Sequence, residues 1–159
     1  MKIREAKLNE LNEIATLLKQ VADIHSKGRP DIFKEKTIEQ LIEYCKNFIN
    51  DQERSMMVAE ENGNIKGVVI YKMKDIKDNP TKLDTKILSV EELVVDENFR
   101  SNGIGKKLLN KMREISRQEK CNSIELNCWS FNKRAMKFYK EYGMDEQRVF
   151  LEMKVDSML

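Results

Sequence analysis

The sequence has few of the residues that mark metal, redox or secreted proteins. Its 159 residues include one histidine, His25, and three cysteines, Cys45, Cys121 and Cys128, with no Cys-x-x-Cys spacing. An odd, unpatterned set of cysteines argues against structural zinc and against a disulfide framework. We therefore expect reduced thiols, a cytoplasmic protein and no bound metal.

An excess of one charge and a long apolar run are also lacking. The 29 basic and 27 acidic residues leave a net charge of +2, which favours no nucleic-acid partner. No run approaches the roughly 18 apolar residues of a membrane span, and 1–5 lacks the apolar region of a signal peptide. With 40% hydrophobic residues, we expect a single domain over 1–159 and no membrane partner.

Apolar spacing and turn residues predict alternating strands and helices. Asn9 and Thr37 are expected to cap the first two helices, and the Gly28–Asp31 segment ends the first of them. Two further helices are expected at 104–119 and 133–142, the latter ended by Gly143. The expected strands lie at 3–6, 56–60, 65–73, 86–95, 123–128 and 147–155.

The order of these elements predicts a mixed sheet in an α/β fold. Asn62-Gly63 marks a hairpin between the second and third strands. Strands 86–95 and 123–128 are joined through a helix, so they must run parallel with a right-handed crossover. We expect helices on both faces of the sheet.

A glycine turn follows the strand at 86–95 and precedes the helix at 104–119. Glycines bring backbone N–H groups close to a ligand, and a helix N-terminus adds unpaired donors, so the turn predicts phosphate binding. A Walker-type loop would need glycine at Arg100 and a hydroxyl residue at Lys107. A dinucleotide fingerprint would need glycine at Leu108. Both of these nucleotide sites are disfavoured.

The pattern Arg-x-x-Gly-x-Gly fits the turn, at Arg100, Gly103 and Gly105. A second pattern, Asn-x-x-Ala-x-x-Phe-Tyr-x-x-x-Gly, fits the chain from Asn132 to Gly143, with Met144 where an aromatic residue is usual. With these two motifs in this order, the chain resembles the GNAT superfamily of acyl-CoA-dependent N-acyltransferases. The resemblance implies a mostly antiparallel sheet in which the parallel strands 86–95 and 123–128 splay apart to admit the pantetheine arm.

The resemblance also implies acetyl-CoA as co-substrate, without a metal. The backbone of Leu93 and Val95 would meet the pantetheine, at a bulge in the strand, and Asn132 would contact CoA. The residues implied to hold the pyrophosphate are Arg100, Ser101, Asn102, Gly103, Ile104, Gly105 and Lys106.

Two catalytic roles follow from the same resemblance. Tyr139 would also contact CoA and protonate the leaving thiolate. Glu91 or Glu92 would accept the proton of the amine, and alternation along a strand predicts that their side chains point to opposite faces. Polyamine-acetylating members of the family favour Glu91. His25 and Cys128 are expected to be structural.

The expected function is therefore acetyl transfer from acetyl-CoA directly to a primary amine, either a small cationic amine or a peptide or protein amine. The alternative is a non-catalytic acyl-CoA-binding regulatory module, which would not need Glu91 or Tyr139. Folds of this kind often pair, so a homodimer is a further expectation.

Overall fold

A computed structural model describes residues 1–50 and 52–155 of the chain. The chain divides into two compact units, one over Met1–Asn127 and one beginning at Cys128. Each unit is described by itself below. The single domain expected over 1–159 stays a prediction.

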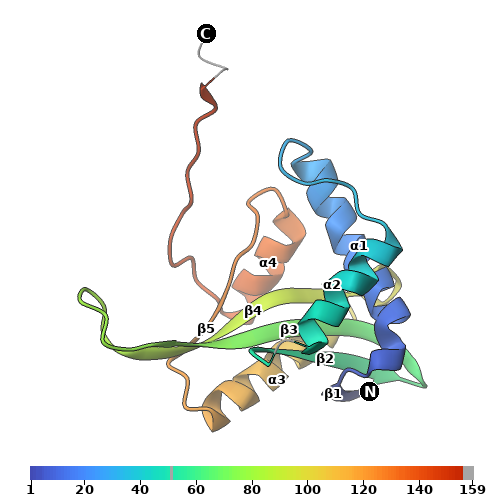
Figure 1. Cartoon of the computed structure of the whole chain (residues 1–159), viewed down its shortest axis with the longest axis horizontal. Helices are drawn as coiled ribbons and strands as arrows, with labels where there is room; N and C mark the ends of the chain where they lie inside the picture. Colours follow the sequence, from blue (N-terminus) through green and yellow to red (C-terminus); the bar gives the residue numbers. More distant parts are fainter. Residues whose placement is uncertain (51, 156–159) are drawn as a thin grey trace. The chain divides into compact units, whose positions relative to one another are not determined.

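The first unit is built on a mixed five-stranded sheet with the order β1-β2-β3-β4-β5 (Figure 1). The first three pairings are antiparallel and the last, between β4 and β5, is parallel, which confirms the expected sheet. The strands are β1 (Lys2–Glu5), β2 (Arg54–Glu61), β3 (Asn64–Ile76), β4 (Thr85–Val95) and β5 (Ser123–Leu126).

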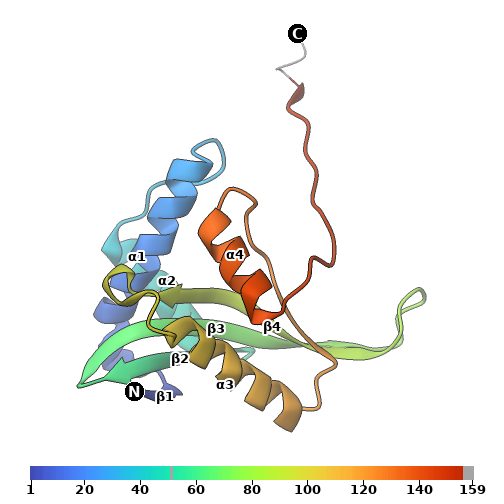
Figure 2. The same cartoon turned by 180° about the vertical axis from the view of Figure 1, so that it is seen from behind.

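Helices cover both faces of this sheet, as expected. Helices α1 (Leu11–Gly28) and α2 (Ile38–Asn50) lie on one face, and α3 (Ile104–Gln118) lies on the other (Figures 1 and 2). Short 3-10 turns, η1 (Leu8–Glu10) and η2 (Glu97–Phe99), precede α1 and α3. Since none of the described helices is both long and apolar enough, no candidate membrane-spanning helix is found.

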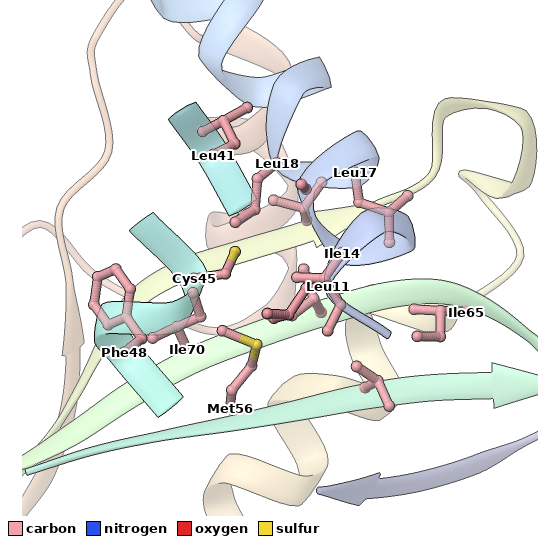
Figure 3. Packing of buried hydrophobic residues seen from close by; sticks show 14 residues of the cluster. Leu11, Ile14, Leu17, Leu18, Leu41, Cys45, Phe48, Met56, Ile65 and Ile70 are labelled. Carbon is pink, nitrogen blue, oxygen red and sulfur yellow. The ribbon is translucent and has the colours of Figure 1, made fainter. Parts of the chain in front are cut away.

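Two hydrophobic clusters, one on each face, hold the helices to the sheet. The α1/α2 face buries Ile14, Cys45 and Ile70, among others (Figure 3). The α3 face buries Val69 and Leu108 with their neighbours. Because Val69 and Ile70 are adjacent in β3 and serve opposite clusters, this sheet is buried on both sides.

The starts of the first two helices follow different local rules. Thr37 caps α2 in a reciprocal box: the Gln40 N–H donates to Thr37 Oγ1 at 3.2 Å, and the Thr37 N–H donates to Gln40 Oε1 at 3.0 Å. The cap expected at Asn9 is wrong, because η1 intervenes and α1 begins at Leu11. Glu10 accepts from the Lys7 N–H at 2.8 Å and pairs with Arg4, which stabilises the η1 turn instead.

The described part of the second unit, up to residue 155, contains one helix, α4 (Lys133–Tyr142), followed by Gly143 in the left-handed conformation at φ +101°. The predicted helix and its glycine stop are therefore confirmed. The strand expected at 147–155 is wrong, because no described residue beyond Gly143 belongs to a strand. In Figure 1 this stretch leaves α4 as an extended trace.

Candidate active site

A β-bulge in β4 lies at the centre of the candidate site. Tyr71 of β3 pairs with Val90, and Ile70 pairs with Glu92, so Glu91 is an extra residue on β4. A bulge in this strand was implied by the family resemblance and is present here. It changes which way the following side chains point.

The bulge places Glu91 and Glu92 on the same face of the sheet. Glu92 lies opposite Ile70, whose side chain belongs to the α1/α2 face. Glu91 forms ion pairs with Arg54, at 2.6 Å, and Lys72, at 2.9 Å. Lys72 is two residues from Ile70 in β3, and Arg54 is its direct partner in β2. Both side chains therefore project from the same face as Ile70. The expectation that the two glutamates face opposite ways is therefore wrong.

The two carboxylates have different protonation behaviour. Burial alone would raise the pKa of Glu91, but hydrogen bonds from Lys72 and Arg54 lower it below the usual range. Burial, together with the charge of Glu91, raises the pKa of Glu92 to about 7. Glu92 is thus the stronger proton acceptor of the two near neutral pH.

The C-terminal half of β4 has an open edge on the side of β5. Pairing with β5 runs from Ile87 to Val90 and goes no further, while β3 continues to pair with β4 as far as Val95. Among the described residues, Glu91–Val95 therefore has no strand on the β5 side. Leu93 and Val95, whose backbone the resemblance implies would meet the pantetheine, lie on this open stretch.

The glycine turn after β4 curves through two left-handed residues, Ser101 at φ +66° and Gly103 at φ +76°. Gly103 is the N-cap of α3 and provides no side-chain cap. By helix geometry, the N–H groups of Gly103, Ile104, Gly105 and Lys106 have no intrahelical acceptor. Gly103 and Lys106 are exposed, so this helix end is open to an anionic ligand.

Arg100 holds the base of the turn. Its Nε donates to the Val95 carbonyl at 3.1 Å, which fixes the chain between the end of β4 and the start of α3. The Arg100 guanidinium thus binds the backbone at the end of β4, while its own residue begins the glycine turn. Ser101 and Asn102, between Arg100 and Gly103, are exposed.

Gly67 of β3 allows α3 to pack close to the sheet. A Cβ at this position would lie 3.1 Å from Leu108 Cδ1, 3.1 Å from the Val94 carbonyl oxygen and 3.2 Å from Ile104 Cγ2. Only glycine leaves this space, so the first turns of α3 lie close against β3. Gly67 was not among the expected site residues, and only the glycine inside an apolar strand pattern hinted at a close approach.

Arg54 and Lys72 were likewise not expected at the site. Their sequence positions carry no motif, and the strand register alone brings them to Glu91. Tyr44 of α2 also belongs to this neighbourhood, because burial and the charges of Glu92 and Glu91 raise its pKa.

The remaining predicted residues, Asn132 and Tyr139, belong to the second unit. Asn132 is the N-cap of α4, and its Oδ1 accepts from the Ala135 N–H at 3.2 Å. Tyr139 lies on the same helix, with its ring 5.2 Å from that of Phe138. The cap leaves the Asn132 side-chain amide with donors for a ligand.

His25, Cys128 and two aromatic residues after β5 are involved in packing or burial. His25 stacks on Phe33 at 5.1 Å, and burial lowers its pKa. Burial raises the pKa of Cys128, which disfavours a thiolate. Trp129 and Phe131 stack at 5.9 Å. In the part of the chain that the structure describes, no group of three or more His, Cys, Asp or Glu is placed to hold a metal.

The profile of the acetyltransferase (GNAT) family matches residues 18–144. This match covers most of the chain, including the bulged strand, the glycine turn and α4. The chain belongs to the GNAT acetyltransferase family. The resemblance drawn from the two motifs is confirmed.

Two curated relatives of this GNAT chain are N-acetyltransferases. The uncharacterised N-acetyltransferase MJ1207 of Methanocaldococcus jannaschii is 31% identical over 106 residues, which are 67% of this chain and 46% of that protein. The thialysine N-epsilon-acetyltransferase of Bos taurus is 33% identical over 57 residues, which are 36% of this chain and 34% of that protein. The matched stretches thus span less than half the length of either relative.

Solved structures share the GNAT fold of the chain. The tetramutant of the BH1408 protein from Bacillus halodurans has a TM-score of 0.93 and 28% identity, covering 98% of this chain and all of that one. The aminoglycoside N-acetyltransferase AAC(6')-Iy in complex with CoA has a TM-score of 0.74 and 17% identity, covering 97% of this chain and 94% of that one. The predicted fold class is confirmed.

Proposed function

We propose that the chain is an N-acetyltransferase that transfers the acetyl group of acetyl-CoA directly to a primary amine. Family membership supports acetyl transfer in general. The observation that carries the proposal is the bulge in β4, where a proton acceptor, Glu92, lies next to a stretch of strand with an open edge.

The proposed CoA site uses backbone rather than charge. The exposed N-terminus of α3, shaped by Gly103, suits a pyrophosphate, because its N–H groups and helix dipole both favour an anion. The open edge at Leu93 and Val95 suits the amides of a pantetheine arm, since an unpaired strand edge offers alternating donors and acceptors. Arg100 positions both parts through its bond to the Val95 carbonyl. Asn132 is proposed as a further CoA contact.

The proposed chemistry needs one proton acceptor and one proton donor. An alkylammonium has a pKa of about 10.4, so its proton must leave before nitrogen attacks the thioester carbon. Glu92, with a pKa near 7, is the proposed acceptor of that proton. As the bond to sulfur breaks, Tyr139 gives its phenolic proton to the thiolate.

Glu91, the first choice from the sequence, is proposed to act through Glu92. Its ion pairs with Arg54 and Lys72 hold the bulged strand and keep the Glu91 carboxylate ionised. That charge contributes to the raised pKa of Glu92. Glu91 is therefore a positioning residue in this proposal, and no residue is assigned to a metal.

The proposed acceptor is a small cationic amine or a peptide or protein amine. The Glu92 carboxylate favours a cationic acceptor, whereas the charge of Glu91 is already paired with Arg54 and Lys72. One relative is named for acetylating the ε-nitrogen of thialysine, a small amine of this kind. We also propose a cytoplasmic location, which the three free cysteines support.

The deciding experiment measures release of the CoA thiol from acetyl-CoA against a panel of polyamines, aminoglycosides, amino acids and peptides. Acceptor-dependent release, with the acetylated amine identified by mass spectrometry, supports the proposal. Binding of CoA by calorimetry with no release for any acceptor favours the non-catalytic acyl-CoA-binding module. Binding of ATP or NAD in preference to CoA contradicts both.

A further inference from the structure

One side chain of α1 is bonded to the short η2 turn that follows β4. The Glu97 N–H donates to Gln20 Oε1 at 2.9 Å, across 77 positions of sequence, and Figure 2 shows the segment after β4 beside α1. Gln20 lies three residues after the buried Leu17, so it is on the face of α1 that packs on the sheet. Leu17 and Val94 of β4 belong to the same buried cluster. The packing of α1 over the end of β4 therefore brings Gln20 to η2.

Four consecutive N–H groups in and before η2 have defined acceptors. The Asp96 N–H donates to the Lys66 carbonyl at 3.0 Å, and the Phe99 N–H donates to the Asp96 carbonyl at 2.9 Å. The Asn98 N–H donates to Asp96 Oδ1 at 3.0 Å. The fourth N–H, that of Glu97, is the one whose bond reaches α1. Strand β3 and the turn itself thus fix three of these groups, and Gln20 fixes the remaining one.

The glycine turn that follows η2 contains a strained residue. Ser101 has φ +66°, in a region that residues with a Cβ rarely adopt. Such a conformation persists only where the neighbouring structure restrains the chain. On the C-terminal side, Ile104 and Leu108 anchor α3, with exposed fractions of 2% and 0%. On the N-terminal side the restraint comes from η2, so the bond to Gln20 helps to hold the turn in shape.

We propose that Gln20 is a positioning residue for the pyrophosphate site, which it serves by holding Glu97 and, through η2, the glycine turn. The inference rests on the proposed function, in which that turn binds CoA. Gln20 acts through the backbone of η2 and makes no contact with CoA in this proposal. Because Glu97 is exposed, water can accept from its N–H when Gln20 is lost. The position of the turn should therefore change more than the stability of the protein.

The test replaces Gln20 with methionine, which has a similar length and no strong acceptor. We expect the dissociation constant of CoA, measured by calorimetry, to rise at least about fivefold, the scale of one lost hydrogen bond. In steady-state kinetics, KM for acetyl-CoA should rise by a similar factor while kcat stays nearly unchanged. Acetyl-pantetheine has no pyrophosphate, so kcat/KM for this shortened substrate should be the same in both proteins.

Two further variants separate the lost acceptor from other effects. Lys19→Met is the matched control, because Lys19 is one residue away on α1 and bonds instead to Asp23 at 2.9 Å and to the Lys36 carbonyl at 3.1 Å. It should leave CoA affinity unchanged. Gln20→Glu keeps an acceptor oxygen and should retain most of the affinity at about 0.3 M salt, which screens the added charge. Melting temperatures check that all three variants remain folded.

The possible results distinguish this inference from the proposed function. Unchanged CoA affinity in Gln20→Met overturns the positioning role, as does an equal loss in Lys19→Met. An equal loss of kcat/KM for acetyl-CoA and acetyl-pantetheine also overturns it, because that result indicates a general structural effect. If the unaltered chain binds no CoA, the proposed function is contradicted, and the role of Gln20 with it.

Discussion

The Nε of Arg54 lies 2.6 Å from a carboxylate oxygen of Glu91, on the face of the sheet that also carries Glu92. A bulge makes this geometry, because an inserted residue ends the alternation of side chains for one step along the strand. Both glutamates thus lie on one face of the sheet, but among the described residues only Glu91 is paired to cations. Their chemical roles differ accordingly.

Replacing Glu92 with glutamine should lower kcat by about a hundredfold or more, the scale on which a general base contributes. Acetyl-CoA affinity should stay nearly unchanged, because the amide keeps the size of the side chain. Glu91→Gln is the matched control, one residue away on the same bulge, and we expect a smaller loss. Steady-state kinetics with the best acceptor decides, and the reverse order of the two losses contradicts the assignment of Glu92.

The pH dependence of activity gives a separate test of the roles assigned to Glu91 and Glu92. A base must be deprotonated, so kcat/KM should rise with pH through the Glu92 pKa of about 7 in the free enzyme and then level off. The charge of Glu91 helps to raise that pKa, so Glu91→Gln should move the midpoint to lower pH. An unmoved midpoint in this variant would show that Glu92 is not the titrating group.

Protein stability should depend on pH through the same group. Because folding raises the pKa of Glu92, the folded state favours the protonated acid. The free energy of unfolding should therefore fall as pH rises from the ordinary glutamate pKa of about 4.5 to about 7. Glu92→Gln should remove this part of the dependence, which chemical denaturation at a series of pH values measures.

Tyr139→Phe should lower turnover about tenfold or more with little change in acetyl-CoA affinity, because only the hydroxyl is removed. The adjacent Phe138→Leu variant is a control for packing on α4, since the two rings lie 5.2 Å apart. The melting temperature should be lowered by Phe138→Leu and not by Tyr139→Phe. Unaltered turnover in Tyr139→Phe would remove the residue from the mechanism.

Much of this fold could be predicted from the sequence. The cap at Thr37 and the glycine stop at Gly143 are local, so both could be predicted from the residues at the helix ends, although the reciprocal bond from Gln40 was not among the expectations. The face of Glu91 could not be predicted, because the bulge depends on register with β3, which alternation along β4 does not contain. The segment 147–155 has a strand pattern, but a strand also needs a neighbour.

Gly103→Ala should weaken CoA binding by about tenfold. A residue with a Cβ at φ +76° costs about 1–2 kcal/mol, and relief of this strain would move the N–H groups that are proposed to bind the pyrophosphate. Gly63→Ala is a closely matched control: its φ is +79°, and a Cβ at either glycine meets no atom within 4 Å. Both variants should lose similar stability. Equal losses of CoA affinity, measured by calorimetry, would contradict a specific role for the turn.

Gly67→Ala tests whether the position of α3 matters for the site. The new Cβ would lie 3.1–3.2 Å from the Leu108 and Ile104 side chains and the Val94 carbonyl, so these neighbours must give way by a few tenths of an ångström. Overpacking of this kind costs about 1–3 kcal/mol, and any shift of α3 would also move the helix end proposed to hold the pyrophosphate. We expect a lower melting temperature together with weaker CoA binding. Leu108→Val removes one of the crowding atoms, so the double variant should be more stable than the two single losses added together. Additive losses would mean that Gly67 does not act through its contact with α3.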